Sequence, residues 1–536
     1  MNMKYDYIIV GGGSAGCVLA NRLSRNNDHR ILLIEAGGAD TSPWIKIPVG
    51  YFKTIHNPQM DWCYKTEPEP ELNNRILDWP RGKVLGGSSS INGLLYIRGQ
   101  AGDYDQWAQE GNAGWSYDDV LPLFKQSESY EYGNDEYHGS VGGLNVSKIR
   151  AKSQISEAFI GAAVEMGVPR SNDFNRLEQE GVGYFDQTAK NGIRCSASNA
   201  FLQPIINRSN LDIKTNAITT NLLFNEGEKK VVNGVRFKIK NNVQYATLKA
   251  GGEVILSAGT IGSPQLLELS GIGQGQVLQK AEIPIRHELN GVGENLQDHL
   301  QVRLVYETNV KTLNDVINSL SGKVKIGLQY ALFRKGPMSL GASQVAAFAK
   351  SKKDLETPDI QFHFQPLSAD KPGLIMHNFS GFTSSVCQLR PQSRGNIHIS
   401  SPYVFDHPKI CPRYLTATAD QLCVVRAIKF AREMGNSPSL KPFIIRNHSF
   451  AEEIKSDEDY LEVARNESQT IYHPTSTCRM GSDKHSVVNS KLQVHGIKNL
   501  RVADASIMPN IVSGNTNAPT IMIGEKASDL ILKSRL

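Results

Sequence analysis

Three glycines near the start of the chain have the spacing of a phosphate-binding turn. Gly11, Gly13 and Gly16 satisfy the pattern GxGxxG directly after an apolar run, and Glu35 follows 19 residues after the last of them. One glycine permits the tight turn, one lets the backbone approach a pyrophosphate, and one lets a helix pack on a strand. The phosphates then lie at a helix N-terminus, and the carboxylate of Glu35 can accept hydrogen bonds from a ribose. The pattern predicts a dinucleotide site but does not choose between NAD and FAD.

The elements that must position these residues follow one another in the chain. The apolar run 5–10 is typical of a buried parallel strand, and apolar residues recur at helical spacing from Ala15 to Leu23. A second apolar run, Ile31–Ile34, ends at Glu35. Strand, turn, helix, strand and terminal acid therefore occur in order within about 30 residues, the context in which the glycine pattern is specific. We predict an N-terminal α/β unit of the Rossmann type.

The composition indicates a large globular protein with unpaired thiols. At 536 residues the chain is long enough for two or more domain-sized cores. Its seven cysteines form no CxxC pair and no His/Cys cluster with zinc spacing, so we expect reduced cysteines, no metal site and a cytoplasmic location. The first apolar run begins within about five residues of the start, which leaves no room for a signal peptide.

The charge pattern and the hydropathy indicate whether the protein binds nucleic acid or spans a membrane. The net charge of +5 is small for this length, and no basic run is interleaved with aromatic residues, so we expect no nucleic acid partner. No segment approaches the ~18 consecutive apolar residues of a membrane-spanning helix. Peripheral contact with a membrane stays open.

A Gly/Ser-rich segment at 81–93, RGKVLGGSSSING, suits close approach by a flat or phosphorylated ligand, although a surface loop is an equal alternative from composition alone. The segment is similar to the first signature of the glucose–methanol–choline (GMC) flavoprotein oxidoreductases, and 259–273 resembles their second signature. Residues 472–474, 501–506 and 514–520 resemble the C-terminal part of the same family. The resemblance therefore covers essentially the whole chain.

The resemblance implies an α/β fold, α+β overall, in which a Rossmann-like FAD-binding domain is joined to a substrate domain whose antiparallel sheet covers the active site. We expect the FAD-binding domain to be discontinuous, built from 1–160, 205–305 and 465–536. The substrate domain, with connecting segments, then comprises 161–204 and 306–464.

Three local patterns fit this layout. Apolar and polar residues alternate over 359–364, the period of a half-buried strand. Apolar spacing predicts a helix at 420–434, ended by Gly435. Ser456 and Asp459 have the spacing of a capping box that opens a helix leading towards the C-terminal motifs.

Oxidation of an alcohol by a flavin needs a base for the hydroxyl proton and a group that stabilises the developing alkoxide. In the family these roles belong to a His in a His-Pro motif and to a His or Asn before the last helix, which the resemblance places at His473 and Asn515. An amide cannot take a proton at neutral pH, so His473 is the expected base of the pair. Asn517 is the neighbouring alternative to Asn515, although it looks more like a flavin contact. Without the resemblance, a structural histidine before Pro474 is an equal alternative.

The resemblance also implies which residues contact the cofactor and the substrate. Some members attach FAD to a His where this chain has Ile91, so we expect FAD to be held non-covalently. Trp62, His363 and Tyr472 are expected to line the substrate pocket. The expected cofactor contacts are Gly11, Gly13, Ser14, Ala15, Gly16, Glu35, Ala36, Arg81, Val84, Gly87, Asn92, Gly93, Leu94, Leu95, Ile218, Ala258, Tyr472, Asp504, Ala505, Asn515, Thr516 and Asn517.

The substrate and the electron acceptor are defined only by class. The expected reaction oxidises a primary alcohol, whether aliphatic, polyol or choline-like, to the aldehyde, and a quinone, a dye-like acceptor or oxygen takes the electrons. Trp62 and Tyr472 suit a quaternary ammonium through cation–π contacts, yet no carboxylate that would pair with it is evident. The segment 378–395 looks more like the aliphatic-alcohol and polyol branch. The alternatives are a non-oxidative FAD-dependent member, such as a hydroxynitrile lyase or a fatty-acid photodecarboxylase, and a non-catalytic flavin-binding scaffold protein.

Overall fold

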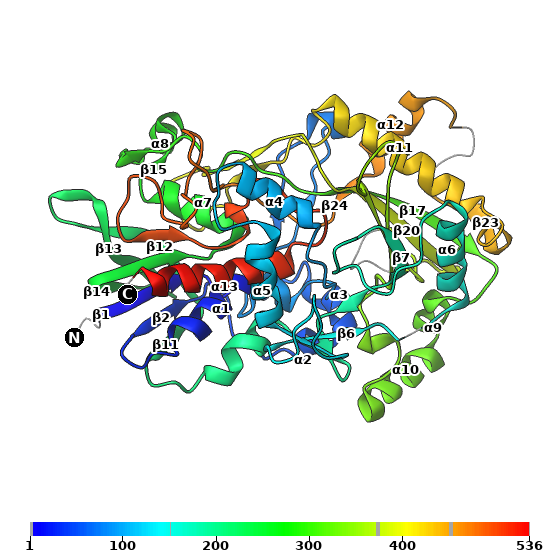
Figure 1. Ribbon diagram of the computed structural model, residues 1–536, viewed down its shortest axis with the longest axis horizontal. Helices are drawn as coiled ribbons and strands as arrows, with labels where there is room; N and C mark the ends of the chain where they lie inside the picture. The colour runs from blue at the N-terminus through cyan, green and yellow to red at the C-terminus, as the bar shows by residue number, and fades with distance from the viewer. Residues whose placement is uncertain (1–3, 151, 371–375, 450–453, 535–536) are drawn as a thin grey trace.

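Two seven-stranded sheets dominate the fold, and Figure 1 shows them in the left and right halves of the molecule. The computed structural model describes residues 4–150, 152–370, 376–449 and 454–534. The first and last described elements, β1 (Lys4–Val10) and α13 (Asn517–Lys533), both lie on the side of the first sheet (Figure 1). The chain therefore crosses from the first sheet to the second and returns.

The first sheet has a parallel core extended by antiparallel strands. Its parallel pairs are β11 with β2, β2 with β1, β1 with β14, and β14 with β25. The sheet continues through β13, antiparallel to β14, and β12, antiparallel to β13. The bounds are β1 Lys4–Val10, β2 Ile31–Ile34, β11 Leu211–Lys214, β12 Ala217–Asn225, β13 Glu228–Ile239, β14 Asn242–Leu256 and β25 Leu500–Val502. Strands β1, β2 and β25 are almost entirely buried, as expected for strands covered on both faces.

Two helices from opposite ends of the chain cover this sheet together. Helix α1 (Ser14–Leu23) follows β1, and helix α13 (Asn517–Lys533) packs beside it, as Figure 1 shows. The contact is close at Gly524, where a Cβ atom would lie 2.9 Å from the carbonyl oxygen of Ala15. A buried ion pair between Arg22 and Glu525, 2.5 Å apart, joins the two helices. Their N-termini are therefore held near one another.

The second sheet is antiparallel throughout. Its strand order is β23-β17-β20-β19-β18-β7, with β24 paired to β17. The bounds are β7 Gly181–Tyr184, β17 Leu300–Thr308, β18 Val345–Ala349, β19 Ile360–Gln365, β20 Gly381–Gln388, β23 Ile444–Asn447 and β24 Gln469–Thr470. Helices α6 (Gln154–Glu165) and α11 (Thr418–Gly435) pack on it through one hydrophobic core, in which Phe159 stacks on Phe364.

The remaining helices connect these layers. Helix α5 lies against the C-terminal helix and α4 packs on α5, α7 packs near β12, and α9 and α10 lie at the outer side of the second sheet (Figure 1). The bounds are α2 Pro43–Lys46, α3 Tyr51–Thr54, α4 Ala101–Gln109, α5 Tyr117–Ser127, α7 Gly259–Leu269, α8 Gly275–Lys280, α9 Leu313–Asn318, α10 Leu320–Phe333 and α12 Asp457–Glu467.

The mixed α/β fold and the predicted elements are confirmed, with one difference. The first strand, the helix after the glycines and the second strand occur as predicted, and Ser456 and Asp459 form the capping box of α12. Helix α11 includes Gly435 and is capped by Asn436. The prediction of a half-buried strand at 359–364 is wrong in its burial, because β19 is buried on both faces. One face packs on α6 and α11, and the other faces the cavity described below.

The predicted division into two domains stays a prediction. Its boundary at 160–161 falls inside α6, and its boundary at 305–306 falls inside β17. Both elements contribute to the core under the antiparallel sheet. The predicted boundaries therefore fall within a helix and a strand that share this core.

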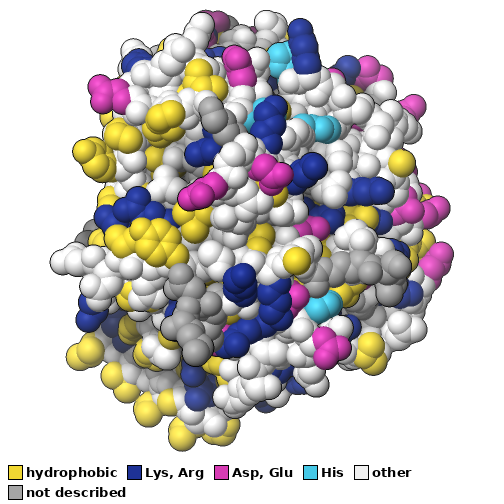
Figure 2. Space-filling model, turned by 90° about the vertical axis from the view of Figure 1, so that its left-hand side faces the viewer, with side chains coloured by type: hydrophobic (Ala, Val, Ile, Leu, Met, Phe, Trp, Pro, Cys, Tyr) yellow, Lys and Arg dark blue, Asp and Glu magenta, His cyan; other side chains and the backbone are white. Residues whose placement is uncertain are grey.

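The described part of the chain bears on disulfides, membrane spans, metal sites and surface charge. The seven cysteines are free, and within the described ranges no helix is long and apolar enough to cross a membrane. Those ranges also contain no group of three or more His, Cys, Asp or Glu side chains that would hold a metal ion. Figure 2 shows the end of the molecule on the side of the parallel sheet, where basic and acidic side chains are interspersed.

Candidate active site

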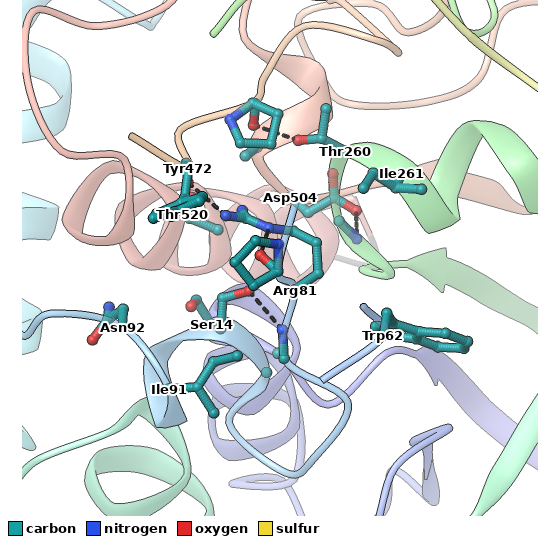
Figure 3. Close-up of a pocket in the computed structure, with 18 of the residues that line it drawn as sticks. Ser14, Trp62, Arg81, Ile91, Asn92, Thr260, Ile261, Tyr472, Asp504 and Thr520 are labelled. Carbon is teal, nitrogen blue, oxygen red and sulfur yellow. Dashed lines mark hydrogen bonds between the residues drawn. The ribbon is translucent and has the colours of Figure 1, made fainter. Parts of the chain in front are cut away.

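A cavity extends from the turn after β1 to the C-terminal motifs, between the two sheets. It is lined at one end by Gly11, Ser14 and Glu35 and at the other by His473 and Asn515. In Figure 3, Arg81 lies near the centre of the view, with Asn92 on one side and Trp62 on the other. The cavity thus joins segments from the start, the middle and the end of the chain.

The glycine turn is a cradle that side chains would fill. Gly11 has a φ of +104°, and a Cβ atom there would lie 2.3 Å from the carbonyl oxygen of Ser257. A Cβ atom on Gly16 would lie 1.9 Å from the oxygen of Gly11, and one on Gly87 would lie 2.8 Å from the Cα atom of Gly13. These approaches leave backbone N–H groups at the start of α1 facing the cavity, an arrangement that fits a pyrophosphate.

Glu35 closes the nucleotide end of the cavity. Its carboxylate accepts hydrogen bonds from the backbone N–H groups of Gly12 and Gly37, each at 2.8 Å. Burial raises the pKa of Glu35 to about 7, and the two backbone N–H groups oppose that rise. A ribose hydroxyl at this carboxylate would replace part of the lost hydration.

The second signature segment supplies another helix N-terminus to the cavity. Helix α7 begins at Gly259, whose N–H donates to Asp504 at 2.9 Å. The same carboxylate accepts from the hydroxyl of Ser263 at 2.6 Å and from the N–H of Ser506 at 2.8 Å. Asp504, from the C-terminal part, therefore fixes the start of a helix more than 200 residues earlier in the chain.

Ile91 lies where an attachment residue for a covalent flavin would be needed. Its side chain lines the cavity and packs in a small apolar cluster with Ile45 and Val84. An alkyl side chain offers no nucleophile, so the residue present fits a flavin held without a bond to this position.

Tyr472 and His473 are held in position by buried polar groups. Tyr472 has a φ of +68°, a backbone conformation that is uncommon for a bulky residue. Arg81 donates to the carbonyl oxygen of Tyr472 at 2.7 Å, and the N–H of His473 donates to Asp298 at 2.7 Å. Asp298 also accepts from the hydroxyls of Thr470 and Tyr414, both at 2.5 Å. The strained turn is thus fixed from several sides.

A chain of hydrogen bonds sets the tautomer of His473. His299 Nε2 lies 2.9 Å from the carbonyl oxygen of Leu389, which only accepts, so this nitrogen carries the proton. His299 Nδ1 must then accept from His473 Nδ1, 3.1 Å away. This leaves His473 Nε2 unprotonated, and it accepts from the side-chain amide of Asn515 at 3.0 Å. The tautomers follow from the partners of each nitrogen.

Burial keeps all three histidines of this region uncharged at neutral pH. It lowers the pKa of His473 well below 6.5, and the neighbouring His299 and His363 lower it further. Burial likewise lowers the pKa of His299 to about 4 and that of His363 to about 3. His473 is therefore a neutral imidazole that can accept a proton.

Nearly all the predicted site residues line this cavity. Trp62, His363 and Tyr472 do so, as do His473 and Asn515. Among the predicted cofactor contacts, Gly16 and Val84 do not line it, since Gly16 lies under the turn and Val84 is in the apolar cluster with Ile91. The other predicted contacts that line it are Gly11, Gly13, Ser14, Ala15, Glu35, Ala36, Arg81, Gly87, Asn92, Gly93, Leu94, Leu95, Ile218, Ala258, Asp504, Ala505, Thr516 and Asn517.

Sequence reasoning missed several residues beside His473 and in the wall of the cavity, some of them from the second sheet. His299 bonds to His473, and Gln301 and Arg303 line the cavity from β17. Tyr51, Ser343 and Gln365 line it as well. A signal existed for the first group, because polar residues at 299, 301 and 303 alternate with apolar ones, which is the period of a strand with one polar face.

Comparison with known proteins agrees with this site. The family model described as GMC oxidoreductase matches residues 5–301 with its N-terminal part and residues 391–524 with its C-terminal part. An alcohol dehydrogenase [acceptor] of Pseudomonas putida is 42% identical over 531 residues, covering 99% of this chain and 96% of the relative. An oxygen-dependent choline dehydrogenase of Photobacterium profundum is 42% identical over 538 residues, covering 99% and 94%.

Solved structures have the same fold. A pyridoxine 4-oxidase from Mesorbium loti is 30% identical, with a TM-score of 0.89 over 98% of this chain and 99% of that one. A formate oxidase variant of Aspergillus oryzae, studied for its FAD modification, is 26% identical, with a TM-score of 0.91 over 100% and 99%. The chain therefore belongs to the GMC oxidoreductase family and is an FAD-dependent oxidoreductase.

Proposed function

We propose that the protein oxidises a primary alcohol to the aldehyde, with His473 as the base that takes the hydroxyl proton. The chemistry that FAD supplies when bound is acceptance of a hydride at its N5 atom. The observation that carries the proposal is the unprotonated Nε2 of His473, 3.0 Å from the amide nitrogen of Asn515. A hydroxyl at this pair meets a proton acceptor and a hydrogen-bond donor together.

The surroundings of the pair support these roles. A His473 that has taken a proton at Nε2 keeps its Nδ1–H bonded to His299. The amide of Asn515 is oriented on its other side by Gln361, whose Nε2 lies 3.4 Å from Asn515 Oδ1. Asn515 then donates to the oxygen on which negative charge develops, and His473 holds the proton.

An aliphatic or polyol alcohol is favoured over choline as the substrate. Lys83 Nζ already lies 4.6 Å above the ring of Trp62, and the ring of Tyr64 stacks on Trp62 at 5.6 Å. Trp62 therefore has little free ring surface for a quaternary ammonium. The relative named alcohol dehydrogenase and the family likeness of 378–395 support the same choice.

A quinone, a dye-like acceptor or oxygen is proposed as the electron acceptor.

Peripheral contact with a membrane is proposed at helix α10. Leu320, Val324, Leu328 and Leu332 follow one another at every fourth position and are 50–80% exposed, at 79%, 54%, 56% and 71%. Lysines lie in the same helix, and 316–335 contains no acidic residue. An apolar stripe beside basic residues suits the surface of an anionic bilayer. The protein should bind vesicles that contain phosphatidylglycerol, and the double variant Leu328→Asp/Leu332→Asp should lose this binding. Leu422→Asp, a control on another exposed leucine, should keep it.

A panel of alcohols tests the proposed reaction. The FAD-loaded protein is mixed anaerobically with primary alcohols, polyols and choline, and the flavin absorbance is followed with and without a dye or quinone acceptor. Bleaching by primary alcohols, with aldehyde formed in equal amount, is the expected result. Bleaching by none of them, in a protein whose flavin dithionite reduces, would instead favour a non-oxidative member of the family.

A further inference from the structure

Arg303 places a positive charge in the cavity for which the protein supplies no acidic partner. The side chain comes from β17, is 6% exposed and lines the cavity. One of its terminal nitrogens donates to the carbonyl oxygen of Ala369 at 3.3 Å, and its Nε has no hydrogen-bond partner. Among the described residues no carboxylate forms an ion pair with it. Most of the five N–H donors of this guanidinium are therefore unused.

The charged and polar groups around Arg303 do not neutralise it. Tyr472 and Tyr51 are the titratable groups that act on it most strongly, and burial raises the pKa of both phenols, so they are uncharged. Among the described residues, the carboxylate that acts on it is Asp370, whose side chain is 82% exposed and pairs with His377 at 3.0 Å. Arg303 is thus a buried cation in an apolar and neutral polar setting, which is costly unless a ligand pairs with it.

The position of Arg303 relates it to the reacting end of the cavity. Gln301 and Arg303 alternate on β17, so their side chains lie on the same face of the sheet, and His299 directly precedes this strand. His299 bonds to His473, whereas Arg303 lies four residues further along, on the order of 13 Å at the rise of a strand. Arg303 therefore lies towards the end of a substrate remote from its reacting hydroxyl. On β19, which is separated from β17 by β20, His363 and Gln365 line the same cavity.

We propose that Arg303 binds a carboxylate carried by the substrate, so that the preferred alcohols are hydroxycarboxylates whose anionic group is remote from the hydroxyl. This inference rests on the proposed function and narrows its substrate class. A guanidinium matches a carboxylate with two parallel N–H···O bonds, which uses donors that the protein leaves free. The same charge repels a quaternary ammonium in a cavity of low polarity, so choline is a poor substrate.

Paired substrates and two variants of one residue test the proposal. The FAD-loaded enzyme is assayed with a dye acceptor on unbranched ω-hydroxycarboxylates of increasing length and on the neutral primary alcohol of each length. Arg303→Met keeps a long side chain without charge. Arg303→Lys keeps the charge but lacks the paired N–H donors of the guanidinium. The flavin spectrum of each variant shows whether the cofactor site is intact.

The wild-type enzyme is expected to have the higher kcat/KM for the hydroxycarboxylate once the chain is long enough to reach Arg303. Arg303→Met should lower that kcat/KM by about tenfold to a hundredfold, mainly through KM, and should change the neutral alcohol by less than about threefold. Arg303→Lys should retain part of the preference. Preference of the wild type for neutral alcohols at every length, or equal losses on both substrates in Arg303→Met, would overturn the proposal.

A binding measurement separates this proposal from the proposed reaction. Simple unbranched carboxylates without a hydroxyl are titrated into the FAD-loaded protein, and the flavin absorption is followed. A saturable spectral change that Arg303→Met abolishes supports the carboxylate site even if no alcohol is oxidised. Absence of any change, in a protein that oxidises neutral alcohols, contradicts the carboxylate site alone.

Discussion

Replacing His299 by leucine should slow reduction of the flavin, although His299 itself does not line the cavity. In the native structure His299 accepts the Nδ1–H of His473 and donates to the carbonyl oxygen of Leu389. Leucine removes the acceptor and leaves the buried Nδ1–H without a partner. The tautomer of His473 with its proton on Nε2 then becomes the more stable one, because the side-chain amide of Asn515 can flip and accept this proton with its oxygen. That tautomer has no free lone pair at Nε2 and cannot act as a base towards the substrate.

The size of the effect follows from the lost hydrogen bond. An unsatisfied buried donor costs about 1–3 kcal/mol, and this cost falls on the productive tautomer. The fraction of enzyme with a free Nε2 lone pair, and with it the rate of flavin reduction, should fall roughly 5- to 150-fold.

His299→Asn is the matched control for His299→Leu. Both variants lose the bond to Leu389, but the amide oxygen of asparagine can still accept the Nδ1–H of His473. Anaerobic stopped flow with a saturating alcohol should give a rate for His299→Asn within several-fold of wild type and a much lower rate for His299→Leu. Equal rates in the two variants, or a near-normal rate in His299→Leu, would refute the idea that His299 positions the base.

Three further predictions follow from the same site. Asn515→Ala should slow flavin reduction roughly 30- to 150-fold, because loss of one donor to the developing alkoxide raises the barrier by about 2–3 kcal/mol. Stopped flow on a variant with unchanged FAD content checks this. FAD should be released into the supernatant on acid precipitation because Ile91 offers no attachment, and yellow precipitated protein would contradict this. The kcat/KM should not decline as the pH falls from 8 through about 6.5, because the pKa of His473 is lowered and its neutral form persists on the acid side; a loss of activity centred near pH 6.5 would show an unshifted base.

The nucleotide end of the site could be predicted from the sequence because its determinants are local. Gly11, Gly13 and Gly16 specify one turn through conformational freedom and close approach, and the strands on either side are apolar runs of the expected length. Glu35 follows at a strand end. Such short-range patterns can be recognised in the sequence without knowledge of the tertiary structure.

The part of the site formed by the second sheet and the residues beside it could not be predicted in the same way. His299 acts through a contact with a residue 174 positions later, and Arg303 matters because of what its surroundings lack. The alternation over 359–364 correctly gave a strand, but it suggested an exposed polar face. That face is buried because it lies against the cavity, which His363 lines. Polar side chains on a strand look the same in sequence whether they face water or a buried cofactor.

The central claim is that His473 is the base that starts alcohol oxidation, and single-turnover reduction of the flavin tests it most directly. FAD-loaded wild type and His473→Ala are mixed anaerobically with the same primary alcohol in stopped flow, and flavin bleaching is recorded. The account predicts that His473→Ala keeps its FAD, is reduced normally by dithionite, and loses most of its reduction by the alcohol, about 100-fold or more. Rapid, near-normal bleaching of His473→Ala by the alcohol would contradict it.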